Sequence, residues 1–394
     1  MYPGATHTRF EHCLGVMDLA SRIFDVVTAE ANLTDDAKAM LPPRDTFGHW
    51  RQVLRLAALC HDLGHLPFSH AAEADLLPDG ITHEDLSRKV IESDEMKSLW
   101  QEFNIPGEAV AKLAVGPNHY PEPLTEWETL LSEIITGDAF GADRMDYLLR
   151  DAYHAGVAYG KFEHHRLIDS IRILPVGETE IPALGIEQGG IQSAESLLWA
   201  RYLMYTQLYF HHVRRIYDFH LQQFLSAWLP GGKFGTEVAA HLAMSDVEVN
   251  SAMRVAAGDR GMPGHEPARR IIRREHFRMV ADFNAADREG EPLAANRLAT
   301  LLSEKFGPDK VKLDNYPPKS KGARFPVLTR DGKIEWSTIL SATLNHVPTF
   351  SVEYVFVDPV VLTPARVEVG RFRKELDDNR AARAAALQKE KRSE

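Results

Sequence analysis

A dense group of potential metal ligands lies between residues 60 and 70, where three histidines and an aspartate fall within ten residues. Imidazole nitrogens and carboxylate oxygens together suit a hard or borderline divalent metal. We expect a helix here, which would place His61 and His65 one turn apart on the same face. A structural histidine cluster is the alternative, but this density of ligands favours a metal site. Such a metal would lower the pKa of a bound water and act as a Lewis acid.

Two further sequence blocks accompany this cluster. Residues 2–12 read YPGATHTRFEH, and residues 141–151 read GADRMDYLLRD. In this order and spacing the three blocks resemble the HD-domain phosphohydrolases, in the branch of the deoxynucleoside triphosphate triphosphohydrolases. Weaker resemblance continues through about residue 290. The resemblance implies one divalent metal ion per site, with Mn, Mg, Fe, Zn, Ni and Co all open. It implies an H…HD…D ligand set, which here is His12, His61, Asp62 and Asp143.

The resemblance also places acidic and basic side chains beside the reacting phosphorus. Its candidates are His65, His70 and His83, with the carboxylates Glu73 and Glu84 to orient them. A carboxylate next to an imidazole fixes its tautomer and increases the protonated fraction near neutrality, which suits a general acid. His70 is the first choice for that acid, because Glu73 follows it within one helical turn. For His83 and Glu84, the start of a helix after Thr82 is a nearly equal alternative.

The same resemblance assigns side chains to the nucleotide. Arg9 lies one turn before His12, and a guanidinium binds phosphate through two nitrogens. Arginine and tyrosine at positions 201, 205 and 209 form a helical stripe, and such a stripe is more often buried core than a ligand surface. The resemblance instead favours a phosphate contact for Arg201 and packing of Tyr209 on the sugar. The expected substrate contacts are Arg9, Arg144, Tyr147, Asp151, Arg201, Tyr205 and Tyr209.

The elements that must position these side chains read mostly as helices up to about residue 160. Apolar residues recur at helical spacing before and after residue 40, and residues 127–156 read as two helices broken near Gly137 and Gly141. β-Prone segments around Gly177 then predict a hairpin, and a long aromatic-rich helical run follows at 191–228. The predicted fold class is mainly α, an HD-domain helical core with a short β-hairpin insertion and a smaller α+β C-terminal region.

Changes in composition predict the domain organisation. We expect a helical catalytic core over 1–235 with the hairpin near 170–187, a helix and Gly/Pro-rich loop over 236–267, an α+β region over 268–362, and a charged tail over 363–394. Within these parts we expect a basic helix at 268–277, strands at 311–313, 325–328 and 350–357, and a solvated, partly helical extension from residue 371.

Length and composition exclude several classes of protein. The 394 residues are 44% hydrophobic and 26% charged, which is typical of a globular chain of two or three domains. No run approaches the ~18 apolar residues of a membrane span, and the N-terminal residues lack a secretory signal. Two cysteines cannot form a disulfide framework, so we expect a cytoplasmic protein. The net charge of −11 argues against a general nucleic-acid coat.

The resemblance favours one reaction, attack of a metal-bound hydroxide on the α-phosphorus of a dNTP, which releases deoxynucleoside and inorganic triphosphate. One alternative is an HD phosphohydrolase acting on a nucleoside monophosphate, a cyclic nucleotide or an alarmone. Another is a nucleotide-sensing or nucleic-acid-binding assembly with vestigial activity. Five arginines in 268–278 could bind a regulatory nucleotide or single-stranded nucleic acid, although a solvated helix face is the plainer interpretation. Relatives and the aromatic residues of 195–225 predict a homo-oligomer, and we expect no membrane partner.

Overall fold

The computed structural model describes residues 2–177, 181–317 and 324–393, and the chain divides into two compact units. Unit 1 comprises residues 1–206, 233–246 and 320–349, and unit 2 comprises residues 207–232, 247–319 and 350–394. The chain therefore passes repeatedly from one unit to the other. The sequence analysis places domain boundaries near residues 235, 267 and 362. Because these boundaries state which segments fold on their own, they remain a proposal.

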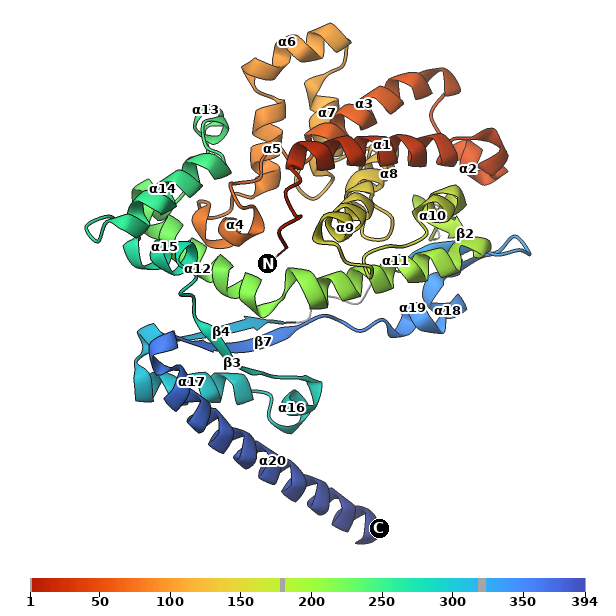
Figure 1. Ribbon diagram of the computed structural model, residues 1–394. Coiled ribbons are helices and arrows are strands. Elements are labelled where there is room, and N and C mark those ends of the chain that lie inside the picture. The colour runs from red at the N-terminus through yellow and green to blue at the C-terminus, as the bar shows by residue number, and fades with distance from the viewer. Residues whose placement is uncertain (1, 178–180, 318–323, 394) are drawn as a thin grey trace. The chain divides into compact units, whose positions relative to one another are not determined.

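Unit 1 is a helical assembly with one small sheet (Figure 1). Its first helix is capped by Thr8, whose side chain forms a capping box with Glu11. The buried residues of this helix recur every three or four positions and pack against α3 and α9. Its helices are α1 (Arg9–Val27), α2 (Asp35–Met40), α3 (Phe47–Cys60), α4 (His70–Leu76), α5 (His83–Ile91), α6 (Asp94–Phe103), α7 (Gly107–Val115), α8 (Glu126–Thr136), α9 (Ala142–Ala155), α10 (His164–Ser170), α11 (Ile191–Met204), α13 (Val238–Leu242), α18 (Ser337–Leu340) and α19 (Ala342–His346).

The sheet of unit 1 contains the predicted hairpin. Strands β1 (Ile171–Val176) and β2 (Ile181–Glu187) pair antiparallel. The sheet order is β1-β2-β5-β6, because β5 (Pro326–Leu328) pairs parallel with β2 and antiparallel with β6 (Ile334–Trp336). The strand expected near residues 325–328 is therefore confirmed, and it extends the hairpin rather than standing apart from it.

Unit 2 contains a three-stranded antiparallel sheet of order β3-β7-β4. Side chains of α17 and α20 pack with residues of this sheet in one apolar cluster, which includes Leu298, Leu302, Val355 and Phe372. The mainly α fold class with a smaller α+β part is confirmed. The elements of this unit are α12 (His212–Trp228), α14 (Asp246–Gly258, whose first residue is counted in unit 1), α15 (His265–Ile272), α16 (Ala285–Gly290), α17 (Ala294–Phe306), α20 (Leu362–Ser393), β3 (Arg278–Asp282), β4 (Val311–Tyr316) and β7 (Val352–Val357).

The prediction that one helix carries both His61 and His65 is wrong, because α3 ends at Cys60 and turns follow. The turn lies against α5, and a Cβ at Gly64 would be 2.0 Å from the carbonyl oxygen of His83. Ser87 of α5 donates its hydroxyl to the carbonyl oxygen of His61 and accepts from the N–H of Gly64, both at 2.9 Å. These contacts replace the backbone hydrogen bonds that would continue the helix.

Three other expectations need correction. The basic helix ends at Ile272, because Arg274 takes a positive φ of 57° and β3 follows. The C-terminal extension is not wholly solvated, since Phe372 and Leu376 of α20 are buried. The aromatic run is interrupted by a π-helical segment at Tyr205–Tyr209 between α11 and α12. None of the described helices is both long and apolar enough to cross a membrane.

Candidate metal centre and active site

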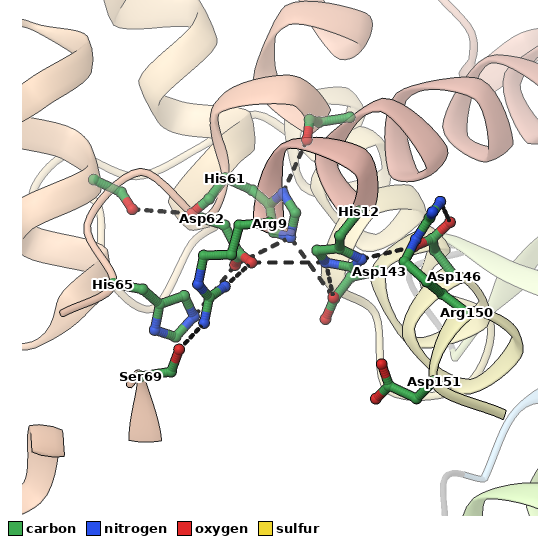
Figure 2. A network of polar contacts seen from close by, with 12 residues as sticks. Arg9, His12, His61, Asp62, His65, Ser69, Asp143, Asp146, Arg150 and Asp151 are labelled. Atoms are coloured by element: carbon green, nitrogen blue, oxygen red, sulfur yellow. Dashed lines mark hydrogen bonds and ion pairs between the residues drawn. The ribbon is translucent and has the colours of Figure 1, made fainter. Parts of the chain in front are cut away.

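Four side chains from three parts of unit 1 converge at one point (Figure 2). His12 projects from α1, His61 and Asp62 from the turn after α3, and Asp143 from the first turn of α9. His12 Nε2 lies 3.1 Å from Asp143 Oδ1 and 3.6 Å from Asp62 Oδ2. His61 Nε2 lies 3.2 Å from Asp62 Oδ1 and 3.6 Å from Asp143 Oδ1. The structure thus brings together the four side chains that the sequence analysis takes as metal ligands.

Hydrogen bonds on the far side of each imidazole fix how the two histidines face this point. His12 Nδ1 donates to Asp146 Oδ2 at 2.8 Å, and Arg150 holds that carboxylate through two hydrogen bonds of 2.8 Å. His61 Nδ1 donates to the carbonyl oxygen of Ala58 at 2.8 Å. Each Nδ1 therefore carries a proton, and a metal that displaces the proton on Nε2 would bind the lone pair of that atom, as in metal-binding histidines.

The contacts within the cluster shift the pKa values of its members. Burial alone would lower the pKa of His12, but Asp143 and Asp146 outweigh it and raise that pKa to about 9. Burial of His61 is likewise outweighed, chiefly by Asp62, and its pKa lies well above the usual value. Burial would raise the pKa of Asp62 and Asp143, but the neighbouring histidines hold both pKa values low. Both carboxylates stay charged, which suits them to hold a cation.

The donor set fits a divalent metal ion. The ligand atoms of His12, His61 and Asp62 all lie within 4.8 Å of one another. His61 Nε2 is buried and makes no hydrogen bond with any residue that the structure describes. Because an unsatisfied buried nitrogen is costly, this atom indicates a ligand. Two imidazoles and two carboxylates suit several first-row divalent ions.

A second group of ionisable side chains adjoins the first. His65 Nε2 lies 3.3 Å from Asp62 Oδ1, and His65 Nδ1 lies 2.5 Å from Glu73 Oε1. Glu73 Oε2 lies 3.2 Å from His83 Nδ1, and the ring of His83 stacks on that of His65 at 4.1 Å. Glu84 Oε1 is 3.3 Å from His83 Nε2. Four of the five expected acid–base residues therefore form a chain that leads away from Asp62.

The remaining member of that set, His70, is the first residue of α4, and its side chain lies outside the described part of the structure. Glu73, expected to orient it, contacts His65 and His83. Thr82 caps α5 in a capping box with Asp85. His83 thus lies both at a helix N-terminus and against the ring of His65, and its part in catalysis stays a prediction.

Arg9 points from the first turn of α1 into the cluster, as Figure 2 shows. Its guanidinium donates to Asp62 and to the hydroxyl of Ser69. This places a cationic group within reach of any anion bound next to the metal ligands.

Three further residues expected to contact substrate lie on α9. Arg144 pairs with Asp138 through Nη2 at 3.0 Å, whereas its Nε and Nη1 are buried and make no hydrogen bond with the described residues. Burial raises the pKa of the Tyr147 hydroxyl. Asp151 accepts a hydrogen bond from His7 Nε2 at 2.8 Å. The same helix thus carries the candidate ligand Asp143 and a buried guanidinium, two nitrogens of which make no hydrogen bond with the described residues.

A change of helix type divides the stripe of Arg201, Tyr205 and Tyr209. Arg201 is in the last turn of α11, and its guanidinium carbon lies 5.6 Å from the ring centre of Tyr205. Residues 205–209 are π-helical, so the register changes after Tyr205. Tyr209 belongs to unit 2. The role of this stripe in substrate binding remains a proposal.

Two family models match consecutive parts of the chain. The HD domain model matches residues 9–151, which contain all four converging ligands, and the model described as the HD associated region matches residues 162–313. Together they cover most of the sequence. The chain belongs to the HD-domain family.

Similar proteins show how far this HD likeness extends. An uncharacterised protein of Methanocaldococcus jannaschii is 37% identical over 219 residues, which are 55% of this chain and 39% of that protein. The deoxynucleoside triphosphate triphosphohydrolase SAMHD1 of Homo sapiens is 29% identical over 242 residues, 55% of this chain and 36% of that protein. The match thus spans less than half of each curated relative. The crystal structure of a hypothetical protein from Aquifex aeolicus is 32% identical with a TM-score of 0.75, covering 93% of this chain and 88% of that one.

Three residues that build the HD site were not singled out as such from the sequence, namely Asp146, His7 and Ser69. Asp146 lies one helical turn after Asp143, and a second carboxylate at that spacing indicates that both side chains lie on the same face of the helix. His7 lies five residues before His12 within the block YPGATHTRFEH, which is a weaker indication. Ser69 carries no sequence signal, because its contact with Arg9 depends on the turn before α4.

Proposed function

We propose that this chain is a metal-dependent phosphohydrolase that converts dNTPs to deoxynucleoside and inorganic triphosphate. The observation that carries the proposal is the convergence of His12, His61, Asp62 and Asp143, with both Nε2 atoms turned to one point. A divalent ion held there would activate water as a nucleophile and polarise a phosphoryl oxygen. The likeness to SAMHD1, a deoxynucleoside triphosphate triphosphohydrolase by name, supports the substrate class.

The proposed reaction breaks the bond between the α-phosphorus and the 5′-oxygen. Water adds to the α-phosphorus and gives up a proton, and the departing 5′-oxygen takes one up. Because an alkoxide is a poor leaving group, a general acid is needed at that oxygen. His70 is our candidate, since α4 begins at this residue directly after the turn that carries the metal ligands. His65, Glu73 and His83 would position the acid and the phosphate.

The environment of Arg144 supports the proposal that the substrate is an anion. The two buried nitrogens of this guanidinium lack hydrogen bonds with the described residues, and separate oxygens of a phosphate chain would accept from them. Arg9 and Arg201 would share the triphosphate charge with it. For Tyr147, Asp151 and Tyr205, which belong to unit 1, we propose contacts with the deoxyribose, the 3′-hydroxyl included.

The basic segment 268–278 supports a nucleic-acid partner less well. Arg269 pairs with Glu266 at 3.0 Å, and Arg270 pairs with Asp358 at 2.7 Å. Two of the five arginines are thus engaged by carboxylates within unit 2. The proposed function therefore includes no nucleic-acid substrate.

Product analysis tests the reaction directly. The protein is reconstituted with each candidate divalent ion, incubated with each dNTP and NTP, and the products are separated by anion exchange. We expect deoxynucleoside and triphosphate, with label from ¹⁸O-water in the triphosphate and not in the nucleoside. Orthophosphate or pyrophosphate as the primary product would contradict attack at the α-phosphorus and would favour an HD phosphohydrolase of another specificity.

Two variants distinguish the loss of the metal ion from the loss of the general acid. The double variant His61→Ala/Asp62→Ala should lose both metal and turnover while keeping its helical circular-dichroism signal. His70→Ala should keep its metal and lose roughly 10²–10⁴-fold in rate. Stoichiometric metal in the double variant, or full activity in His70→Ala, would overturn the corresponding assignment.

A further inference from the structure

A segment distant in sequence lies along the turn that carries the metal ligands. We call residues 61–69 the metal loop and residues 233–246 the strap; both belong to unit 1, where α13 of the strap packs beside α5. The strap meets the metal loop and α4 through hydrogen bonds of 2.8 to 2.9 Å. They join Lys233 Nζ to the Leu77 carbonyl, the Phe234 N–H to the Leu76 carbonyl, His241 Nε2 to the Leu63 carbonyl, and the Phe68 N–H to Asp246 Oδ1.

The last of these contacts falls on an unfavourable part of the backbone. Phe68 has a φ of 60° and Ser69 a φ of 54° with ψ at −135°. Both residues carry a Cβ, which clashes with the backbone at positive φ. Two such residues in succession persist only where the surroundings hold them.

The turn at Phe68 and Ser69 positions the Ser69 hydroxyl and the start of α4, both of which lie near the candidate metal ligands. The Ser69 hydroxyl accepts from Arg9, whose guanidinium also contacts Asp62. Directly after Ser69, α4 begins and carries Glu73 to His65 and His83. A change at Phe68 and Ser69 would therefore displace both the arginine contact and the start of α4.

We infer that Asp246 is a positioning residue for the active site. Its carboxylate accepts the Phe68 N–H at 2.9 Å and thereby sustains the left-handed turn at Phe68 and Ser69. A charged acceptor makes a stronger hydrogen bond than a neutral one, which suits it to hold a strained backbone. The inference goes beyond the proposed reaction and rests on it only for the activity measurements below.

Amide hydrogen exchange tests the contact without reference to activity. In Asp246→Ala the Phe68 amide should exchange about tenfold faster than in the wild type, and in Asp246→Asn, which keeps an acceptor oxygen, the change should be smaller. Glu237→Ala is the matched control, because this residue is exposed on the same strap and its side chain makes no capping hydrogen bond to α13. Unchanged exchange at Phe68 in Asp246→Ala would overturn the inference.

A double-mutant comparison tests whether Asp246 acts by sustaining positive φ. Glycine adopts positive φ without a Cβ clash, so Asp246→Ala should matter little in a Phe68→Gly background. Phe68→Ala is the matched background, because it also removes the phenyl ring but keeps the Cβ. We expect Asp246→Ala to lower kcat/KM about tenfold in the Phe68→Ala background and less than threefold in the Phe68→Gly background. Equal losses in the two backgrounds would contradict the mechanism.

Metal affinity completes the test. Asp246 contacts none of the four metal ligands among the described interactions, so Asp246→Ala should bind metal within about twofold of the wild type. A loss of metal similar to that of His61→Ala would show a general collapse of the site and would overturn a positioning role. If no dNTP is hydrolysed by the wild type, the proposed function fails, while the exchange experiment still decides the role of Asp246.

Discussion

Asp146 contacts the candidate metal centre through His12. Its carboxylate accepts from His12 Nδ1 and is itself held by Arg150 in a bidentate pair. Burial would raise the pKa of Asp146, but His12 and Arg150 outweigh burial and keep it low, so the acceptor stays charged. A charged acceptor behind an imidazole fixes its tautomer and makes Nε2 a better ligand.

Replacing Asp146 by asparagine should therefore weaken metal binding by about 10–100-fold without removing a ligand. Titration calorimetry with Mn²⁺ or Co²⁺ measures the change. Asp18→Asn is the control, because Asp18 forms the same kind of i,i+4 pair with Arg22 at 2.9 Å on an exposed surface. Equal metal affinity in Asp146→Asn and Asp18→Asn would show that His12 does not need this partner.

The four converging side chains could be predicted from the sequence as candidate ligands, whereas the groups that hold them in place could not. His12, His61, Asp62 and Asp143 lie in three blocks whose order and spacing resemble a known family. The Ala58 carbonyl that fixes His61 is a backbone atom, so no residue type marks it. The contact between Ser69 and Arg9 requires two positive φ angles that the sequence does not signal, since neither Phe68 nor Ser69 is glycine.

At the scale of elements, the approach of α1 to α9 decides the position of Asp146. A Cβ at Gly15 of α1 would lie 1.9 Å from Asp146 Oδ1 and 2.5 Å from Arg150 Nη2. Gly15→Ala should thus displace this pair, weaken metal binding about tenfold or more, and lower the free energy of unfolding by ~1–3 kcal/mol.

The control for that substitution is Gly48→Ala in α3, where an added Cβ meets nothing within 4 Å. This change should leave metal binding intact and raise stability by up to about 1 kcal/mol, because alanine favours a helix over glycine. Metal titration and urea unfolding measure both variants. A Gly15→Ala protein as stable and as metal-replete as Gly48→Ala would contradict the proposed packing.

Within unit 2, His220 of α12 makes stability depend on pH. The side chain is fully buried, and its Nε2 accepts the Phe277 N–H at 3.2 Å. Burial lowers the pKa of His220 to about 4. Between pH 6.5 and 4 the unfolded state binds the proton first, so this contribution to stability is present above about pH 6.5 and is lost as the pH falls toward 4.

The difference between those two pKa values corresponds to at most roughly 3 kcal/mol of the free energy of unfolding. Urea unfolding at pH 7.5, 6, 5 and 4 should show a steeper fall for the wild type than for His220→Gln, whose amide oxygen can still accept the Phe277 N–H. Parallel pH dependences in the two proteins would show that His220 is not the group responsible.

Elements with strong periodicity or clear turn residues were predicted well. The break between α8 and α9 falls at Gly137 and Gly141, and the hairpin spans β1 and β2 as expected. The helix over His61 to His65 failed because the packing of Gly64 on α5 determines the turn there, and local propensity does not report that packing. Strand β3 was missed because its residues, Arg278–Asp282, follow directly on a basic run that reads as helix.

At the scale of the whole molecule, we propose that the protein forms a homo-oligomer. Trp199, within the aromatic run 195–225, keeps 40% of its surface exposed in the single chain. An exposed aromatic residue of this size in an apolar run is typical of an interface.

Light scattering at micromolar concentration should give a mass above 44.3 kDa, and Trp199→Glu should lower it. Ile339→Glu is the control, because Ile339 is exposed but lies outside that run. A monomeric wild type, with and without metal and dNTP, would contradict the proposal. An unchanged mass in Trp199→Glu would place the interface elsewhere, and equal losses in the two variants would show that the effect is not specific to Trp199.

The parallel pairing of β2 with β5 has a consequence for how the chain is synthesised. Strand β2 is complete at Glu187, but the strand that covers its open edge begins only at Pro326. At ribosomal speeds of about 5–20 residues per second, that edge waits roughly 7–28 s for its partner. An uncovered edge strand pairs readily with other chains. A nascent polypeptide released before residue 326 would therefore expose a surface for aggregation, and the cell would have to shield it until translation reaches β5.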